Sequence, residues 1–480
     1  MKNPNLSKIE KIPYLSKIKK IAKKQDVEVY LVGGVLRDIF LSGKIIKLDF
    51  DFAVEKKVEK FVRGFAKEVK GRIVVLDKVL RNIRVVKKKK GQILNYDFSV
   101  FRKQPFKEDI KKRDFTVNTL AVKINSYPAL KLIDFASGLR DLNRKVVKCV
   151  SSHAFKDDAL RIMRAYSLKA QYNFKIVRDT ERLIVKDKDL LSKISPERIS
   201  EELFKIFKNP KSYSLIKDMD KSSVLTKIFP QINPMRGIGK AGYHHLDVWD
   251  HSVETLRCFE SLYRRKVSRS QDIQKYLGVS VAQSRSRLVL IKFACLFHDI
   301  GKPKAMVQKK KKTLFHSHEK IGADMLDKIC KNLRLSGKET DFIKHLTFMH
   351  LRPGYLADTK RPSKRAIFRY FRDAGEDAVG ILLLSLADWR ATRGPLTDLK
   401  KRRSHERIMF YLIDEYFKEK KKPAEKRLVT GNDIMKSLDI SPSPLLGKIL
   451  RIIDENQVLG KVKTKQQALK LARHIYKQKT

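Results

Sequence analysis

Cysteine is scarce in this sequence, and long hydrophobic runs are absent. The 480 residues include four cysteines, and no two of them form a Cys-x-x-Cys pair. This spacing argues against a zinc ribbon and a disulfide framework, and it favours a reducing, cytoplasmic setting. The longest apolar runs, such as 381–387, are too short to cross a bilayer, and the charged N-terminus lacks the apolar core of a signal peptide. We therefore expect a soluble protein with no membrane partner.

Acidic residues are also few relative to basic ones. The chain has 107 Lys and Arg against 53 Asp and Glu, which gives a formal net charge of +54. Such an excess is extreme for an enzyme of small metabolites and indicates a polyanionic partner, for which nucleic acid is the natural candidate. The 42% hydrophobic content is that of a folded protein. The length predicts about two to four domains.

Apolar periodicity divides the chain into a β-rich first part and a helical remainder. Strands are predicted at 27–32, 48–54, 72–76, 83–86, 94–101 and 120–124. Helices are predicted at 13–24 and 57–69 between them, and at 157–171 and 196–207 beyond residue 151. A stretch with proline and glycine, 229–242, indicates a linker. The pattern predicts an α+β protein with a mixed-sheet head followed by all-α parts.

Two aspartates in the segment Leu-Asp-Phe-Asp-Phe are the first candidates for chemistry. Side chains at i and i+2 of a strand point to the same face, so Asp49 and Asp51 can hold divalent cations between them. A hairpin-like run upstream, 32–38, contains Gly33 and Gly34, whose backbone N–H groups can approach phosphate oxygens closely. Carboxylate-held Mg²⁺ facing such a loop suits phosphoryl or nucleotidyl transfer.

Charged residues further along the chain can contact a nucleotide. Arg113 offers a planar fork to a ribose or a phosphate. On a helix, Asp158, Arg161 and Arg164 fall at i, i+3 and i+6 along one face. Such a set presents acceptors and donors to the edge of a base, although an ordinary intrahelical salt bridge is the alternative.

The order of these motifs resembles that of class II tRNA nucleotidyltransferases and bacterial poly(A) polymerases. The motifs are Gly33-Gly34-x-x-Arg37-Asp38, Asp49-x-Asp51, Arg113-Asp114-Phe115-Thr116, Asp158-x-x-Arg161 and Glu197-Arg198-Ile199. They occupy roughly residues 28–210. The resemblance implies an enzyme that adds CMP and/or AMP, from CTP and ATP, to the 3′ end of tRNA without a nucleic-acid template.

The resemblance also implies a role for each matched residue. Asp49 and Asp51 hold catalytic Mg²⁺, with Asp97 as a candidate third carboxylate. The remaining nucleotide-binding candidates are Gly33, Gly34 and Arg37 at the triphosphate, Arg113 at the ribose, and Asp158 and Arg161 at the base, with Arg164 nearby. The 3′ hydroxyl of the tRNA attacks the α-phosphate and releases pyrophosphate.

Three departures from the family pattern bear on the product. Asp157 stands where the family usually has Glu, and Ser167 stands where an Arg is common. The segment between Arg102 and Arg113 is short, whereas many full CCA-adding members carry a longer flexible loop there. Addition of CCA, addition of CC alone and synthesis of poly(A) therefore stay open as products.

A second set of residues resembles the HD phosphohydrolase superfamily. The candidate metal ligands are His251, His298, Asp299, His318, His345, His350 and Asp388. Mixed His and Asp ligands suit Mn²⁺, Fe²⁺, Ni²⁺ or Mg²⁺ better than structural zinc. The activity that this resemblance implies is hydrolysis of phosphate monoesters or 2′,3′-cyclic phosphates.

Four parts are expected along the chain. They are a catalytic head at 1–145, a helical neck for base selection and tRNA binding at 146–238, an HD domain at 239–400 and a tRNA-binding helical tail at 401–480. Two rivals belong to other classes: an HD phosphohydrolase whose head only binds RNA, and a non-catalytic RNA-binding protein. The sequence leaves the oligomeric state open.

Overall fold

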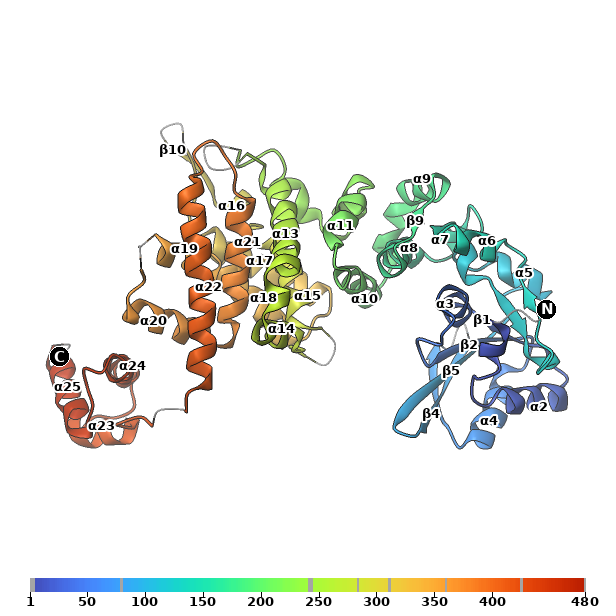
Figure 1. Ribbon diagram of the computed structural model, residues 1–480, viewed down its shortest axis with the longest axis horizontal. Helices are drawn as coiled ribbons and strands as arrows, with labels where there is room; N and C mark the ends of the chain where they lie inside the picture. The colour runs from blue at the N-terminus through green and yellow to red at the C-terminus, as the bar shows by residue number, and fades with distance from the viewer. Residues whose placement is uncertain are drawn as a thin grey trace. The chain divides into compact units, whose positions relative to one another are not determined.

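The computed structural model divides into two compact units, Met1–Ile228 and Phe229–Thr480 (Figure 1). It describes residues 5–77, 81–240, 245–282, 285–309, 312–358, 361–423 and 426–478. The first unit contains a mixed sheet followed by helices, and the second is almost wholly helical. The expected α+β class is confirmed. In the described ranges, no helix combines the length and the apolar character that crossing a membrane requires.

A seven-stranded sheet in the order β3-β4-β5-β2-β1-β6-β7 forms the head. Its strands are β1 (Val29–Val32), β2 (Asp49–Val54), β3 (Arg72–Asp77), β4 (Asn82–Lys89), β5 (Gln92–Val100), β6 (Ala121–Lys123) and β7 (Leu132–Ile133). β2 and β5 pair in parallel, and the other neighbours are antiparallel. The six predicted strands are all present, with ends that differ by a few residues.

Helices and short elements complete the first unit. They are α1 (Leu6–Ile9), α2 (Leu15–Gln25), α3 (Gly34–Ser42), α4 (Val58–Val69), α5 (Phe106–Lys111), α6 (Gly138–Asn143), α7 (Ala154–Asp157), α8 (Leu160–Tyr172), α9 (Arg178–Asp187), α10 (Pro196–Phe207), α11 (Ser212–Lys221), α12 (Val224–Ile228), η1 (Thr116–Asn118), η2 (Ile124–Ser126), η3 (Lys188–Lys193), β8 (Val146–Val147) and β9 (Lys175–Ile176). The expected helix at 157–171 is therefore two helices, α7 and α8, with a break at residues 158 and 159.

Alternation along β2 and β5 separates an apolar face of the sheet from an acidic one. Phe52 and Phe98 are register partners on one face, and their ring centroids lie 5.2 Å apart. Phe65 of α4 packs edge-on against Phe98 at 5.3 Å, so this helix covers the apolar face. Because side chains alternate along a strand, Asp51 and Asp97 point to the opposite face. The core of the head thus fixes the direction of the acids.

The second unit is a bundle built around two apolar helices. Its elements are η4 (Pro230–Met235), α13 (Val248–Arg265), η5 (Val267–Arg269), α14 (Gln271–Gly278), α15 (Arg287–Phe297), α16 (Lys302–Ala305), β10 (Met306–Lys309), β11 (Lys312–Phe315), α17 (His318–Asn332), α18 (Gly337–Met349), α19 (Arg352–Ala357), α20 (Lys364–Ala374), η6 (Gly375–Asp377), α21 (Ala378–Ala391), α22 (Leu399–Lys421), α23 (Gly431–Leu438), α24 (Pro444–Val458) and α25 (Lys465–Lys477). α15 and α21 are apolar nearly all round and buried along most of their length, as central helices should be.

Two expected boundaries differ from the structure. The segment 229–242 is not simply a linker, because Phe229 packs on Phe297 with ring centroids 5.0 Å apart and η4 buries two further apolar side chains. Residues 241 and 242 lie outside the described ranges. The boundary expected at residue 400 falls inside α22, which packs on α21 and continues to Lys421. The HD part therefore extends beyond that residue.

The aromatic layer under the acids predicts a large stability effect in the head. We expect Phe98→Ala to lower the stability of the head by about 3–5 kcal/mol, since the change removes a fully buried ring. The matched control Phe135→Ala removes a ring that is 51% exposed and should cost less than about 0.5 kcal/mol. Differential scanning calorimetry measures both. Equal effects of the two changes would contradict the proposed packing.

Candidate active sites of the two units

Three carboxylates lie together on the open face of the head sheet. Asp51 of β2 is the direct register partner of Asp97 on β5, and Asp49 precedes Asp51 by two residues on the same face. Asn95 donates its side-chain N–H to Asp49 at 2.6 Å. Arg84 donates to both carboxylate oxygens of Asp97 at 2.7 and 2.8 Å. The structure therefore brings together the three acids that the sequence singled out, and it adds Asn95 and Arg84, which the sequence analysis missed.

The electrostatics of this cluster favour a bound cation. The pKa of Asp51 is raised to about 6, first by desolvation among protein atoms and then by the charge of Asp97. Arg113 and Arg164 pull this pKa down, and Asp49 raises it slightly. Solvent still reaches the Asp51 side chain and screens part of the effect. A divalent cation between the carboxylates relieves their repulsion, so the donor set fits Mg²⁺.

The glycine pair joins β1 directly to α3, so this run is a strand–turn–helix connection and not the expected hairpin-like one. Gly33 adopts φ +81°, a value that side chains rarely allow. A Cβ at Gly33 would also lie 2.9 Å from Asp51 Oδ2. The absence of a side chain therefore lets the start of α3 lie against the acid cluster. Free N–H groups of a first helical turn are suited to phosphate oxygens.

Arg37 lies in the interior of the head and not on the open surface. It is 7% exposed, and its guanidinium donates to Asp38 at 2.9 and 3.1 Å and to Asn118 at 2.6 Å. The guanidinium carbon also lies 4.3 Å from the centre of the Tyr172 ring. These contacts tie α3 to η1 and α8. These bonds do not support the expected contact between Arg37 and the triphosphate, because the guanidinium is already bonded to protein groups.

Arg113 and Asp114 lie where the head meets the neck helices. Arg113 donates to Asp109 at 3.2 Å, and its buried Nε has no hydrogen-bond partner among the described residues. Asp114 is 6% exposed and forms an ion pair with Arg164 at 2.7 Å. Burial works to raise the pKa of Asp114, but Arg164, Asn118 and a backbone N–H together hold it below its usual value. The sequence analysis did not select Asp114 as a candidate site residue, although its place in the motif Arg113-Asp114-Phe115-Thr116 could have indicated it.

The expected helical register of Asp158 is wrong. This residue has extended backbone, φ −157° and ψ 108°, between α7 and α8. One of its carboxylate oxygens accepts the N–H of Leu160 at 3.1 Å, and the other accepts from Arg198 at 3.0 Å. Arg161, which is 3% exposed, instead donates to the backbone carbonyls of Lys112 and Arg113, at 2.7 and 3.2 Å. The partner of Asp158 in the structure is therefore Arg198.

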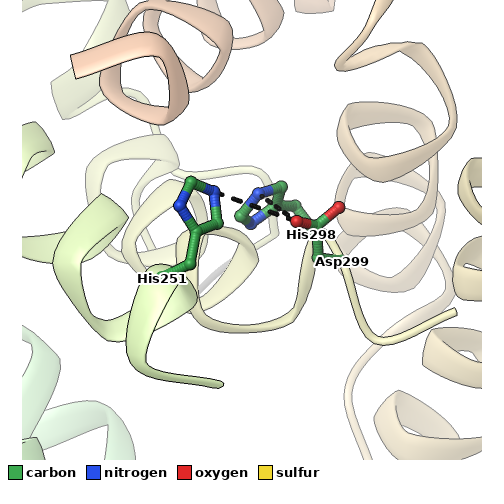
Figure 2. Close-up of side chains that lie close together, drawn as sticks. All are labelled: His251, His298 and Asp299. Carbon is green, nitrogen blue, oxygen red and sulfur yellow. Dashed lines mark ion pairs between the residues drawn. The ribbon is translucent and has the colours of Figure 1, made fainter. Parts of the chain in front are cut away.

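Six of the seven candidate metal ligands converge in the second unit. His251 comes from α13, His298 and Asp299 follow α15, His318 begins α17, His350 follows α18 and Asp388 lies on α21. They form three overlapping groups whose ligand atoms lie within 4.8 Å of one another. Figure 2 shows His251, His298 and Asp299 pointing toward one another. The Nε2 atoms of His251 and His298 lie 3.9 and 3.4 Å from Oδ2 of Asp299.

Hydrogen bonds orient three of these imidazoles. The Nδ1 atoms of His298, His318 and His350 lie 3.0, 2.7 and 2.6 Å from backbone carbonyl oxygens. A carbonyl can only accept, so each Nδ1 carries a proton and each Nε2 is the nitrogen that is left to bind a metal. Among the described residues, Nε2 of His298, Nε2 of His318 and Oδ1 of Asp299 are buried without a hydrogen-bond partner. These unpartnered atoms fit a divalent cation.

Close backbone packing sets the positions of these ligands. A Cβ at Gly301 would lie 2.1 Å from the carbonyl oxygen of His318, so the chain after α15 touches the start of α17 directly. Lys302 follows and forms an ion pair with Asp299 at 2.6 Å. Burial opposes protonation of His298, but Asp299 and Asp388 outweigh it and raise its pKa to about 10. The cluster therefore attracts positive charge.

His345 is the candidate ligand that the structure does not bring to the cluster. Its Nδ1 lies 2.7 Å from a carboxylate oxygen of Asp377, and its side chain is 31% exposed. It belongs to none of the ligand groups found among the described residues. The expectation that His345 is a ligand is therefore wrong. Histidine frequency alone could not separate it from the true members of the cluster.

Models of known protein families match both the head and the second unit. The "Poly A polymerase head domain" model matches residues 29–148, the "Probable RNA and SrmB- binding site of polymerase A" model matches 173–236, and the HD domain model matches 248–457. The chain belongs to the tRNA nucleotidyltransferase and poly(A) polymerase family. It is an enzyme of the transferase class and also carries an HD domain.

Similar proteins in this family cover nearly the whole chain. An A-adding tRNA nucleotidyltransferase of Deinococcus radiodurans is 28% identical over 91% of this chain and 93% of its own length. A CC-adding tRNA nucleotidyltransferase of Synechocystis is 25% identical over 93% of both chains. The solved structure of a Thermotoga maritima CCA-adding enzyme with tRNA has a TM-score of 0.62 at 19% identity, covering 97% of this chain and 95% of that one. The fold of this family is thus present throughout.

The charge repulsion at Asp51 predicts a gain in stability when the charge is removed. Its folded-state pKa of about 6 exceeds the ordinary 3.8, so the ionised carboxylate destabilises the metal-free protein at neutral pH. We expect Asp51→Asn to raise Tm by a few degrees at pH 7.5 without Mg²⁺, and we expect this gain to fade as the pH falls from about 6 to about 4. Asp179→Asn, at a carboxylate that is 81% exposed, should give no gain. A lower Tm for Asp51→Asn would contradict the repulsion.

The imidazole geometry predicts which histidines hold metal. His298→Ala should weaken metal retention by about tenfold or more, because it removes a ligand with a free, oriented Nε2. His345→Ala should leave the metal content unchanged, since His345 pairs with Asp377. Elemental analysis of both variants after dialysis measures the effect. The assignment is rejected if His345→Ala loses metal or if His298→Ala keeps it.

Proposed function

We propose that the head and neck transfer CMP and/or AMP from CTP and ATP to the 3′ end of tRNA and so build or repair its CCA terminus. The observation that carries this proposal is the cluster of three carboxylates beside the Gly33–Gly34 start of α3. The 3′ oxygen of the RNA bonds to the α-phosphorus, its proton passes to solvent, and the bond from that phosphorus to the pyrophosphate oxygen breaks. The net charge of +54 supports tRNA as the partner.

Asp49 and Asp51 would hold Mg²⁺, and Asp97 would add a third carboxylate. Bound Mg²⁺ supplies charge stabilisation at the triphosphate. Arg113 and Arg164 lie close enough to affect the pKa of Asp51, and they suit binding of the anionic substrate. Arg37 would act indirectly, by fixing the start of α3 through its buried contacts.

The neck would select the incoming base. We keep Asp158 and Arg161 as the proposed selectors. Arg198 would orient the Asp158 carboxylate, to which it donates at 3.0 Å. Arg161 is held at the carbonyls of residues 112 and 113, which fixes its guanidinium at the junction of neck and head. These bonds and one to the carbonyl of Ala154 engage Nη1 and one N–H of Nη2, and they hold the rest of the guanidinium in one orientation, so less ordering is needed when a base binds.

Addition of CC alone is the second candidate product. The segment between Arg102 and Arg113 contains the six-residue helix α5. Phe106 of this helix is 5% exposed and stacks on Tyr30 with ring centroids 3.8 Å apart. The N–H of Arg102 also binds Asp109 at 2.8 Å. A segment packed in this way has little freedom to act as a long flexible loop. This favours an enzyme that adds only the two C residues.

In the second unit, the six converging ligands support a site for Mn²⁺, Fe²⁺, Ni²⁺ or Mg²⁺. With this metal bound, the second unit would hydrolyse phosphate esters. A bound metal there supplies an activated water.

The four cysteines are free and buried, which supports a cytoplasmic location.

Terminal addition tests the main proposal. Purified protein is incubated with tRNA that lacks its CCA end, and with tRNA that ends in CC, each with CTP, ATP or both. We expect addition of CC, A or CCA, and loss of more than about a thousandfold in rate for Asp49→Ala with Asp51→Ala, because the metal ligands are removed. His298→Ala is the matched control and should keep nucleotide addition. A ladder of many A residues, or activity in the double variant, would overturn the proposal.

A further inference from the structure

The second unit contains a cavity that is larger than its metal ligands need. Its volume is about 740 Å³, and Asp299, His318, His350 and Asp388 line part of it. Other parts of its wall come from α19 and α22, which supply none of the candidate ligands. The residues on these two helices are therefore free to determine which molecule the site accepts.

The first turn of α22 concentrates positive charge beside this cavity. Lys400, Lys401, Arg402 and Arg403 follow one another there, and the turn contains no acidic residue. The N-terminal end of a helix is already positive, so four cations at this end are unfavourable unless an anion compensates them. Lys401 and Arg402 line the cavity. Within the described ranges, neither side chain takes part in an ion pair, which leaves both free to bind a ligand.

Acids on the cavity wall do not cancel this charge locally. Asp398 caps α22 and accepts the N–H of Lys400 at 2.7 Å, and its single negative charge offsets one of the four cations. Glu319 and Asp358 also line the cavity, but they belong to α17 and to the end of α19. The α22 side of the wall is therefore the side suited to an anionic group.

An exposed aromatic ring lies on the same cavity. Tyr355 of α19 is 69% exposed and lines the wall with Leu396, which is 61% exposed. An open aromatic face is suited to stacking with a nucleic-acid base. Stacking of this kind contributes about 1–3 kcal/mol per base.

We propose that Lys401 and Arg402 form a subsite for a second phosphate and that Tyr355 stacks on the adjoining base. This inference rests on the phosphohydrolase activity proposed for the second unit. The substrate is then a nucleotide whose terminal phosphate is accompanied by another phosphate, either an RNA 3′ end or a nucleoside bisphosphate. In the reaction, a water oxygen bonds to the terminal phosphorus, the ester bond to the ribose oxygen breaks, and that oxygen takes up a proton.

Three probes with the same scissile 3′-phosphate test the subsite. They are adenosine 3′-monophosphate, adenosine 3′,5′-bisphosphate and a short oligoadenylate that ends in a 3′-phosphate. We expect Lys401→Gln with Arg402→Gln to raise KM for the bisphosphate, the oligonucleotide or both by about tenfold or more, with kcat changed less than about twofold. KM for the monophosphate should stay unchanged. Loss on the oligonucleotide alone identifies an RNA end, and loss on the bisphosphate alone identifies a free nucleotide.

Matched variants separate the subsite from general charge. Lys400→Gln with Arg403→Gln removes the same two charges from the same turn, but neither residue lines the cavity, and this change should leave every KM as in the wild type. Tyr355→Ala should raise KM for all three probes, and Tyr355→Phe should restore it because the ring remains. The subsite is overturned if the double variant affects all three probes equally or affects none.

Binding keeps the subsite testable apart from hydrolysis. If the wild type with Mn²⁺, Ni²⁺ or Mg²⁺ hydrolyses none of the probes, the proposed phosphohydrolase activity fails. Equilibrium dialysis with labelled adenosine 3′,5′-bisphosphate then decides the subsite. Weaker binding by the Lys401→Gln, Arg402→Gln protein than by the Lys400→Gln, Arg403→Gln protein supports it, and equal binding overturns it.

Discussion

Repulsion among carboxylates on one face of the head sheet is the constraint on which the first site depends. A parallel pairing of β2 with β5 places Asp51 directly beside Asp97, and no relaxation of the strands can separate them without breaking the ladder. The aromatic layer on the opposite face holds that register, because a slip by one residue would bury the acids and expose the rings. The stability of the core is thus used to hold an arrangement that is unfavourable without a cation, and the site is ready to bind one.

In the second unit, the candidate metal ligands are held in position in a different way. Its ligands come from five helices or their ends, so no single strand register can align them. Alignment comes instead from backbone carbonyls that accept from Nδ1 of three imidazoles, and from direct backbone contact at Gly301. In the head a side chain is oriented by the pleat of the sheet, whereas here it is oriented by a backbone carbonyl at the end of a helix or just before one. The arrangement in the second unit leaves buried polar atoms of His298, Asp299 and His318 that the described protein groups do not satisfy.

The sequence predicted the parts of this structure that depend on local periodicity. Alternation alone placed Asp49 and Asp51 on one face, and the strand assignments followed from the same signal. It could not predict that Arg37 would be buried, since its partners Asn118 and Tyr172 lie far along the chain. The break before α8 was missed for a similar reason. Asp158 lies just before α8, accepts the N–H of Leu160 and binds Arg198, and a periodic pattern does not distinguish a residue just before a helix from one inside it.

Product choice and chemistry are separable in such a molecule. The acids decide that a phosphoryl bond is exchanged, and their positions follow from a sheet register that any member of the fold can share. In the function that we propose, the choice of base would depend on residues that bridge the head and the neck helices, where Arg161 binds the carbonyls of Lys112 and Arg113. A shift of α5 or of its connection would move those carbonyls and with them the guanidinium. The packed ring of Phe106 would therefore link the length of the segment between Arg102 and Arg113 to the shape of the proposed base site.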